Sequence, residues 1–210
     1  MLKINEIFFS LQGESSKSGL PTTFIRLSGC HLRCQYCDTK YAYHNGENLD
    51  IKSIIKKVKN YQSKHVCITG GEPLLQKSVY PLMTQLCDKG YKVSLETSGD
   101  KSAVLVDNRV KKIIDIKTPD SKAGVSVHFD NLKNLSNTEL KFVICSDKDF
   151  NWAENFVKEN NLSESKILYS PSFGEVTATH LAEKILSSGS SAQLQIQLHK
   201  YLWPNKESGI

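Results

Sequence analysis

Short runs of aliphatic and β-branched residues alternate along this chain with amphipathic stretches, and this alternation constrains the fold more than any other feature. The runs predict seven strands, at residues 23–28, 65–69, 92–96, 112–116, 139–144, 166–169 and 193–198. Several runs are almost continuous in Val, Ile and Leu, which is typical of strands that are covered on both faces. The chain therefore favours a buried, largely parallel sheet.

Helices are predicted between the strands because apolar residues recur there at helical spacing. These stretches lie at residues 51–58, 79–86, 149–160 and 181–186. Asp50 precedes the first as an N-cap candidate, and Gly90 and Gly189 are placed to end the second and the fourth. Residues 117–138 show no helical period, which predicts a loop with short extended pieces.

The strand–helix–strand order implies parallel pairing with right-handed crossovers. Six or seven strands are one or two fewer than a closed barrel needs, so we expect an α/β fold, an incomplete TIM-like β/α barrel. It should form a single domain over residues 1–210, with residues 205–210 as a flexible C-terminal tail. Polar segments follow six of the predicted strands, and ligands of parallel sheets bind at that end.

Composition narrows the functional classes. The formal charge of +5 is mild and the lysines are spread along the chain, which argues against a dedicated nucleic-acid-binding protein. No apolar stretch is long enough to span a bilayer, and the N-terminus lacks the apolar core of a signal peptide. We therefore expect a cytoplasmic protein with reduced thiols, in which clustered cysteines indicate metal rather than disulfides. Cys67, Cys87 and Cys145 stand apart and are expected in the core.

Three cysteines, Cys30, Cys34 and Cys37, lie within eight residues. A structural zinc site and an all-cysteine iron–sulfur cluster both need four ligands, so three thiolates predict a cluster with one iron free of protein ligands. The alternative is a zinc knuckle, completed by one of the following residues: His31, His44 or Cys67. A zinc ribbon normally has a second paired-ligand motif downstream, and none is present.

Two further motifs follow predicted strands. The segment Thr69-Gly70-Gly71-Glu72-Pro73 combines glycines that let a ligand approach the backbone with a carboxylate that can accept hydrogen bonds. An ordinary βα turn is the alternative. Thr39 follows Cys37 by two residues and offers a hydroxyl either to a hard cation such as Mg²⁺ or to a hydrogen bond within its own loop.

Four polar residues near the chain ends are candidate ligand contacts. Gln12 and Glu14 flank a glycine, where an amide and a carboxylate could recognise a heterocycle, although a polar turn is equally compatible. Arg26 lies within a buried strand and needs an anionic partner, either a substrate carboxylate or an internal salt bridge. His199 ends the last predicted strand, where a structural role is the alternative to ligand binding.

The cysteine spacing and Gly70-Gly71-Glu72-Pro73 together resemble the two commonest signatures of the radical S-adenosylmethionine (SAM) superfamily. The resemblance implies a [4Fe–4S] cluster whose open iron chelates the amino and carboxylate groups of SAM. One-electron reduction would then cleave SAM to methionine and a 5′-deoxyadenosyl radical. The cofactors would carry the chemistry, while the protein would orient them.

Within this superfamily, the chain resembles the 7-carboxy-7-deazaguanine synthases over nearly its whole length. Three blocks carry the likeness: residues 6–14, residues 24–39 and residues 197–204. The likeness implies a ring contraction of 6-carboxy-5,6,7,8-tetrahydropterin to 7-carboxy-7-deazaguanine with loss of ammonia, on the way to the modified tRNA base queuosine. SAM would be regenerated rather than consumed.

The resemblance also implies site residues. Cys30, Cys34 and Cys37 would hold the cluster, and Thr39 would ligate Mg²⁺. The residues expected to bind SAM are Tyr36, Cys37, Asp38, Gly71, Glu72, Asp115, Ile116, Lys117, Ser170, Pro171, Ser172 and Phe173. The residues expected to bind the pterin substrate are Leu11, Gln12, Gly13, Glu14, Arg26, Thr69 and His199.

The resemblance further implies an electron donor such as flavodoxin or ferredoxin and a homodimer, with no direct contact to nucleic acid or membrane. A runner-up enzyme class is a radical SAM activase that generates a glycyl radical on a partner protein. It shares both superfamily signatures but gives no reason for Gln12, Glu14 and His199. A metal-binding module without catalysis is a third possibility, and it would carry one zinc and no iron.

Several positions depart from the family pattern. Ser15 follows Glu14 where glycine is expected, and Ser170 begins a loop that often starts with glutamine. Six residues follow Pro204. In relatives that end near this proline, the C-terminus can reach the substrate, and that contact is not predicted here.

Overall fold

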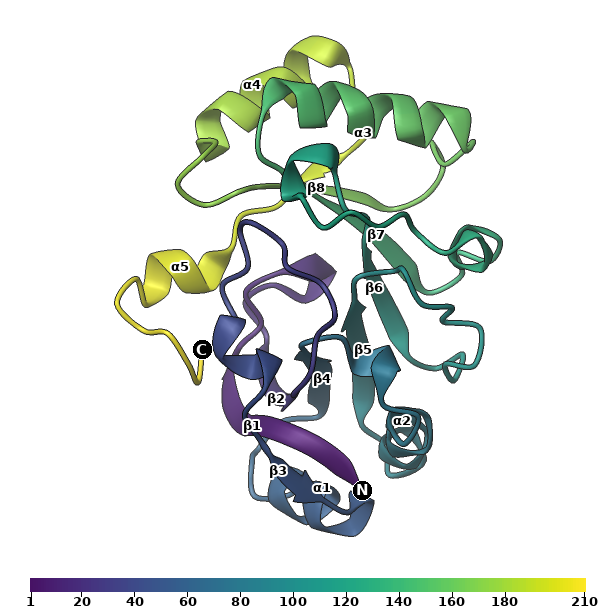
Figure 1. Ribbon diagram of the computed structural model, residues 1–210, viewed down its shortest axis with the longest axis vertical. Helices are drawn as coiled ribbons and strands as arrows, with labels where there is room; N and C mark the ends of the chain where they lie inside the picture. The colour runs from purple at the N-terminus through teal and green to yellow at the C-terminus, as the bar shows by residue number, and fades with distance from the viewer.

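The computed structural model describes residues 1–210 and contains one sheet of nine strands (Figure 1). The strands are β1 (Leu2–Leu11), β2 (Pro21–Leu27), β3 (Glu47–Leu49), β4 (His65–Gly70), β5 (Lys92–Thr97), β6 (Lys111–Asp115), β7 (Thr138–Ile144), β8 (Ile167–Pro171) and β9 (Gln193–Leu194). Their order across the sheet is β3-β1-β2-β4-β5-β6-β7-β8-β9. All seven predicted strands are present, although the last is shorter than predicted.

The parallel part of the sheet consists of β2 and β4 to β9. β1 is antiparallel to both of its neighbours, β2 and β3, so β1 and β3 extend the sheet beyond β2 as an antiparallel edge. The sheet does not close, because β3 and β9 are edge strands at opposite ends of the order. The expected incomplete barrel of largely parallel strands is confirmed.

β1 is the largest element that the sequence analysis did not predict. Leu2 and Ile4 are buried, but polar residues such as Glu6 interrupt the apolar run and obscure the strand. β1 pairs with β2 as far as Leu11, which lies opposite Pro21. The polar turn expected before the first strand therefore lies between β1 and β2, and it emerges at one end of the sheet.

Five helices accompany the sheet: α1 (Ile51–Val58), α2 (Val79–Asp88), α3 (Asp147–Glu159), α4 (Ala178–Ser188) and α5 (Leu198–Leu202). The first four match the predicted helices. Asp50, Ser146 and Thr177 cap α1, α3 and α4 by accepting backbone N–H groups, and Gly189 ends α4 with a φ of 69°. Figure 1 shows α3 and α4 at one end of the molecule and α1 and α2 toward the other. No helix is both long and apolar enough to cross a membrane.

Two apolar cores lie between the sheet and these helices. One joins α1 and α2 to the first strands and includes Ile25, Ile68 and Leu82, whereas the other joins α3 and α4 to later strands and includes Phe142 and Ile185. Burying a side chain of this size contributes about 1.5–3 kcal/mol. Side chains alternate along each strand, so the residues between these core positions face the opposite side of the sheet.

The prediction of a strand over residues 193–198 is wrong after residue 194. β9 ends at Leu194, and the chain then crosses the turn after β1. The Gln195 amide bonds the backbone of Ser15 through both its oxygen and its nitrogen, at 2.6 and 2.9 Å, and Leu198 N–H donates to the Gly13 carbonyl at 2.9 Å. These contacts draw the chain out of the sheet and into α5, so His199 lies on a helix. The loop predicted at residues 117–138 is confirmed, but the short ordered pieces within it are 3₁₀ turns rather than the expected extended pieces.

Candidate active site

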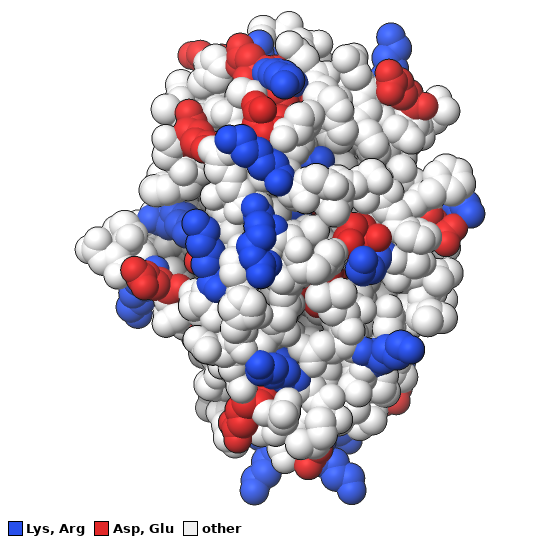
Figure 2. All heavy atoms as spheres, in the orientation of Figure 1, with Lys and Arg blue, Asp and Glu red and all other residues white.

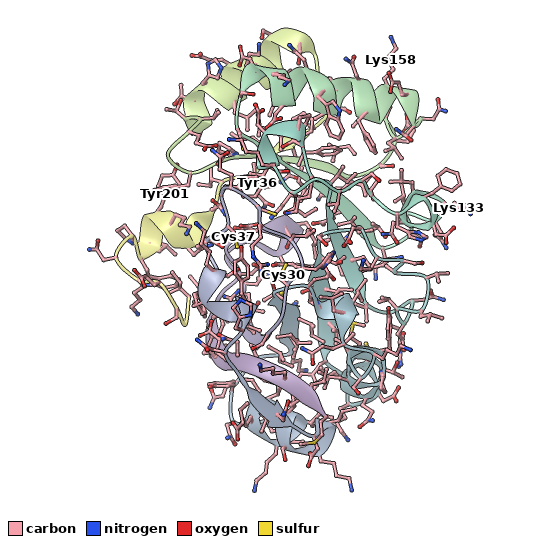
Figure 3. All side chains as sticks on the ribbon, in the orientation of Figure 1. Cys30, Tyr36, Cys37, Lys133, Lys158 and Tyr201 are labelled. Atoms are coloured by element: carbon pink, nitrogen blue, oxygen red, sulfur yellow. The ribbon has the colours of Figure 1, made fainter.

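A cavity of about 800 Å³ lies at the carboxyl ends of the parallel strands. Its walls come from the turn after β1, the loop at residues 28–39 (the cysteine loop), the ends of five strands, and α5. In Figure 3, Cys30, Tyr36 and Cys37 lie on the loop that crosses in front of the sheet. The polar segments that follow the parallel strands therefore share one end, as topology predicted.

The cysteine loop directs three thiols toward the cavity. Cys30, Cys34 and Cys37 are all partly exposed and all line it. The loop is entered through Gly29, whose φ of 95° suits glycine. The Arg33 guanidinium donates to the Cys30 carbonyl at 2.8 Å and so braces the loop from outside.

The donor set fits a cluster that takes three thiolates. Burial raises the pKa of Cys30 and Cys34, because a thiolate loses hydration there. A cationic metal group would offset this cost by pairing with the thiolates. Three thiols without a fourth protein ligand match a [4Fe–4S] cluster with one open iron.

The alternative zinc knuckle finds no support. No three His, Cys, Asp or Glu side chains converge as ligands of a single ion. His31 pairs with Asp100 at 2.6 Å, and the buried Cys67 thiol lies 3.5 Å from a Glu96 oxygen. His44 is exposed on the surface. Each candidate fourth ligand is therefore engaged or positioned elsewhere.

The Gly70–Gly71 turn packs directly against the cysteine loop. Glu72 N–H donates to the Gly29 carbonyl at 2.8 Å, and Gly71 N–H donates to the Leu27 carbonyl at 2.9 Å. A Cβ atom on Gly71 would clash with the Gly29 carbonyl, so this close approach requires glycine. The two superfamily signatures therefore form one continuous wall.

The Glu72 side chain does not face the cavity, although we expected it to contact SAM. It is fully buried, and its carboxylate accepts hydrogen bonds of 2.6–2.9 Å from the backbone of Leu74 and Ser98 and from the hydroxyls of Thr97 and Ser98. The carboxylate thereby fastens the turn to the end of β5. Gly70 and Gly71 line the cavity, so this turn presents its backbone there instead.

Most of the other residues expected to bind SAM line the cavity, namely Tyr36, Cys37, Asp38, Gly71, Asp115, Lys117, Ser172 and Phe173. Three do not. Ile116 faces the apolar core under α3, and Ser170 is buried within β8. Pro171 borders a separate cavity of about 360 Å³.

Three buried polar atoms of the cavity residues have no hydrogen-bond partner: the hydroxyls of Tyr36 and Ser172, and Oδ1 of Asp115. Buried polar atoms are almost always paired, and an unsatisfied one costs about 1–3 kcal/mol. Burial raises the pKa of Tyr36 well above its ordinary value, so the hydroxyl stays protonated and able to donate. A ligand that offers both donors and acceptors would satisfy all three atoms.

The residues expected to bind substrate all line the same cavity, namely Leu11, Gln12, Gly13, Glu14, Arg26, Thr69 and His199. Thr39 lines it too, with its hydroxyl 3.8 Å from Cys37 Sγ. The Gln12 amide and the Thr69 hydroxyl donate to the two carboxylate oxygens of Glu96, at 3.3 and 3.0 Å. Glu96 was not predicted, although a carboxylate at the end of a buried strand was a usable signal.

Glu14 is held by two further residues that sequence reasoning missed. Lys141 Nζ lies 2.5 Å from one carboxylate oxygen, and Gln197 Nε2 donates to the other at 2.9 Å. Burial alone would raise the pKa of Glu14, but Lys141 and His199 outweigh it and hold the pKa below its ordinary value. Lys141 interrupts an apolar strand, and that isolated charge was the signal available in the sequence.

Arg26 forms the internal salt bridge that was one of its two expected roles, and part of its guanidinium stays free. Its Nε donates to Glu6 at 2.7 Å, which is an internal salt bridge, and the Tyr41 hydroxyl donates to the same oxygen at 2.8 Å. Its Nη groups donate no hydrogen bond to the protein, and the residue lines the cavity. Gly209 N–H donates to the other Glu6 oxygen at 3.1 Å, so the segment after Pro204 folds back to this ion pair.

α5 places His199 against the N-terminal motif. A Cβ atom on Gly13 would clash with the His199 ring, so the two are in close contact. His199 and Lys200 lie 3.7 and 3.1 Å from the same Asp38 oxygen. Burial opposes ionisation of Asp38, but these two groups hold its pKa below the ordinary range.

Comparisons of the sequence with known proteins agree with this geometry. The family model described as the Radical SAM superfamily matches residues 24–154. A protein called 7-carboxy-7-deazaguanine synthase from Chlorobaculum tepidum is 40% identical over all of this chain and 97% of its own length. A protein of the same name from Koribacter versatilis is 37% identical, and the alignment covers both chains completely.

Solved structures give the same result. The crystal structure of QueE from Escherichia coli matches with a TM-score of 0.75 and 25% identity, over 94% of each chain. Streptococcus suis SuiB bound to S-adenosylmethionine matches with a TM-score of 0.54 and 15% identity, over 86% of this chain and 51% of that one. The second likeness concerns the fold alone.

Proposed function

This chain belongs to the 7-carboxy-7-deazaguanine synthase family of the radical SAM superfamily, and on that premise we propose how its cavity serves the reaction. It is a radical SAM lyase that contracts 6-carboxy-5,6,7,8-tetrahydropterin to 7-carboxy-7-deazaguanine with loss of ammonia, in the pathway to queuosine. One observation carries the proposal at the level of residues: a single cavity is lined by the three thiols of the cysteine loop, by Gln12 and Glu14, and by Arg26 with its free Nη groups.

The enzyme uses a [4Fe–4S] cluster, SAM and Mg²⁺. When bound together, the cluster and SAM supply the radical chemistry. Cys30, Cys34 and Cys37 hold the cluster and leave one iron for SAM. The polar groups assigned to SAM are the Gly71 backbone and the unpaired atoms beside the cysteine loop, on Tyr36, Asp115 and Ser172.

The pterin occupies the wall formed by the turn after β1. Glu14 accepts hydrogen bonds from the amino and N–H groups of the ring, and the backbone of Thr69 and the amide of Gln12 complete that edge. Arg26 takes the substrate carboxylate through its Nη groups in a bidentate pair, a geometry that guanidinium and carboxylate share. His199 closes this wall from α5.

Thr39 would hold Mg²⁺ beside the substrate carboxylate, where the ion would help to fix that group. The Thr39 hydroxyl has only a long contact with Cys37 Sγ, which supports its availability to a cation. Mg²⁺ prefers oxygen ligands and usually keeps several waters, so waters would complete the coordination begun by the hydroxyl and the carboxylate.

An electron donor such as flavodoxin or ferredoxin docks on the face that carries the cysteine loop. Figure 2 shows several Lys and Arg side chains on this face. Arg33 and Lys40, in and beside the loop, are exposed and form no ion pair, which suits an acidic partner.

We also propose that the protein is a homodimer and that it is cytoplasmic. Size-exclusion chromatography with light scattering would test the first proposal, and cell fractionation would test the second.

The reaction is tested with anaerobically reconstituted protein, SAM, a reductant and the carboxytetrahydropterin. We expect 7-carboxy-7-deazaguanine in amounts that exceed the SAM consumed. A protein with an intact cluster that forms no such product would contradict the function. A radical left on a partner protein, detected by electron paramagnetic resonance with SAM consumed, would favour the activase class instead.

A further inference from the structure

Lys141 is a buried cation in the cavity wall to which the family signatures assign no role. It lies on β7, and its side chain is 11% exposed. Its neighbours Leu140 and Phe142 belong to the apolar core on the other face of the sheet. A lysine is costly at such a position unless it is paired, so its partners indicate what it does.

The main partner of Lys141 is Glu14. Lys141 Nζ lies 2.5 Å from Glu14 Oε2 and 3.6 Å from Asp115 Oδ2. Asp115 already has a closer cation, because Lys117 Nζ lies 2.9 Å from the same oxygen. Without Lys141, Glu14 would keep only the neutral Gln197 amide and the more distant His199 ring.

The contacts of Glu14 leave part of its carboxylate free for a ligand. Gln197 and Lys141 each occupy one acceptor site, on different oxygens. An ionised carboxylate offers about four such sites, so at least one lone pair on each oxygen remains. Because both oxygens are restrained from the protein side, the carboxylate cannot rotate and its free edge points in a fixed direction.

We propose that Lys141 is a positioning residue for the substrate: it holds Glu14 as an oriented anion against which the donor edge of the pterin ring binds. The inference rests on the proposed function, and it adds a specificity determinant to it. A carboxylate that is both ionised and fixed selects a ring that presents adjacent N–H donors, since a ring with acceptors there would face an unpaired negative charge.

Removing Lys141 should also change the pH dependence of substrate binding. The charged groups near this pair are His199 from α5, Glu96 from β5, and Asp115 from β6 with Lys117 just after that strand. Lys117 is already paired with Asp115, so without Lys141 only His199 would still favour ionised Glu14, and burial would raise the pKa of Glu14 in such a variant. As the pH is lowered, the substrate affinity of this variant would therefore begin to fall at a higher pH than that of the wild type.

The test measures binding of 6-carboxytetrahydropterin by calorimetry to the cluster-containing protein with SAM and without reductant, so that no turnover occurs. We expect Lys141→Met to weaken pterin binding about tenfold or more, as loss of a charge-assisted contact does, and to leave SAM binding within about twofold. Lys141→Arg should restore most of the affinity and the wild-type pH profile. Lys112→Met is the control, because Lys112 lies on the neighbouring strand β6 and does not line the cavity.

A double-mutant cycle keeps the test decisive if Lys141→Met folds poorly. Glu14→Gln removes the charge that Lys141 balances, so adding Lys141→Met to Glu14→Gln should weaken pterin binding no further. Any of three results would overturn the inference. Lys141→Met could lose pterin and SAM affinity equally, Lys141→Arg could fail to restore pterin binding, or the effects of Lys141→Met and Glu14→Gln could be additive. A wild-type enzyme that forms no product would instead overturn the proposed function itself.

Discussion

Among the six cysteines of the chain, only three line the cavity. Two thiolates cannot hold a cubane cluster stably, so Cys34→Ala should lose most of its iron and all activity. Cys87→Ala should keep both, since Cys87 lies on α2, away from the cavity. Iron and sulfide analysis after anaerobic reconstitution checks this, and a full iron content in Cys34→Ala would contradict the assignment.

The Glu72 side chain points into the protein core rather than into the cavity, so we expect it to contribute mainly to stability. Glu72→Gln replaces one acceptor oxygen with an NH₂ group and leaves one or more buried donors of Thr97 and Ser98 unpaired. We expect a loss of about 2 kcal/mol in the free energy of unfolding, measured with urea. Glu47→Gln, at an exposed side chain, should be nearly neutral. Unchanged stability with weakened SAM binding would mean that the carboxylate acts on the ligand.

The Thr39 hydroxyl is the group assigned to Mg²⁺. Thr39→Val keeps the shape of the side chain but removes the oxygen, so half-maximal activity should require about tenfold more Mg²⁺ or more, a loss comparable to that of one metal contact. Thr39→Ser should behave nearly as the wild type. If the two variants show the same Mg²⁺ requirement as the wild type, the cation lies elsewhere.

At the scale of elements, α5 and the turn after β1 act as one unit. Gly13→Ala would push His199 and α5 outward, because the added methyl group clashes with the ring. We expect KM for the pterin to rise at least about tenfold, with an overpacking cost of about 1–3 kcal/mol. Gly19→Ala, in the same turn, strains a φ of 85° but meets no atom within 4 Å, so it should lower stability without raising KM.

The elements that could be predicted are those whose pattern is local. Strands such as β4 and helices such as α1 have a recognisable pattern of apolar residues within their own sequence. The three cysteines of the cysteine loop likewise lie within eight residues of one another. α5 has only five residues, too few for a period, and it forms because Leu198 and Gln195 bond the turn after β1. Glu96 and Lys141 belong to the site through partners over eighty residues away in the chain, a relation that single-sequence patterns do not record.

At the scale of the whole molecule, buried ion pairs make stability depend on pH. Burial opposes ionisation of Glu14 and Asp115, but Lys141 and Lys117 hold both pKa values below their ordinary values near 4. The folded state therefore binds fewer protons than the unfolded state in that range. The stabilisation is complete above about pH 5 and is lost as pH falls through the folded pKa values.

Urea unfolding at a series of pH values measures this effect. We expect a nearly constant free energy of unfolding between about pH 6 and 8 and a decline below about pH 4.5. Lys141→Met should show a shallower decline, since Glu14 then has less ionisation to lose. An identical decline in both proteins would show that the pair does not stabilise the fold.

The central claim is that one cavity holds the cluster, SAM and the pterin together. The most direct measurement is a crystal structure of the anaerobic, cluster-containing protein with SAM and 6-carboxytetrahydropterin bound. We predict three irons on Cys30, Cys34 and Cys37, the fourth on SAM, and the pterin between Glu14 and Arg26. A fourth protein ligand on the cluster, or a pterin bound outside this cavity, would contradict the account.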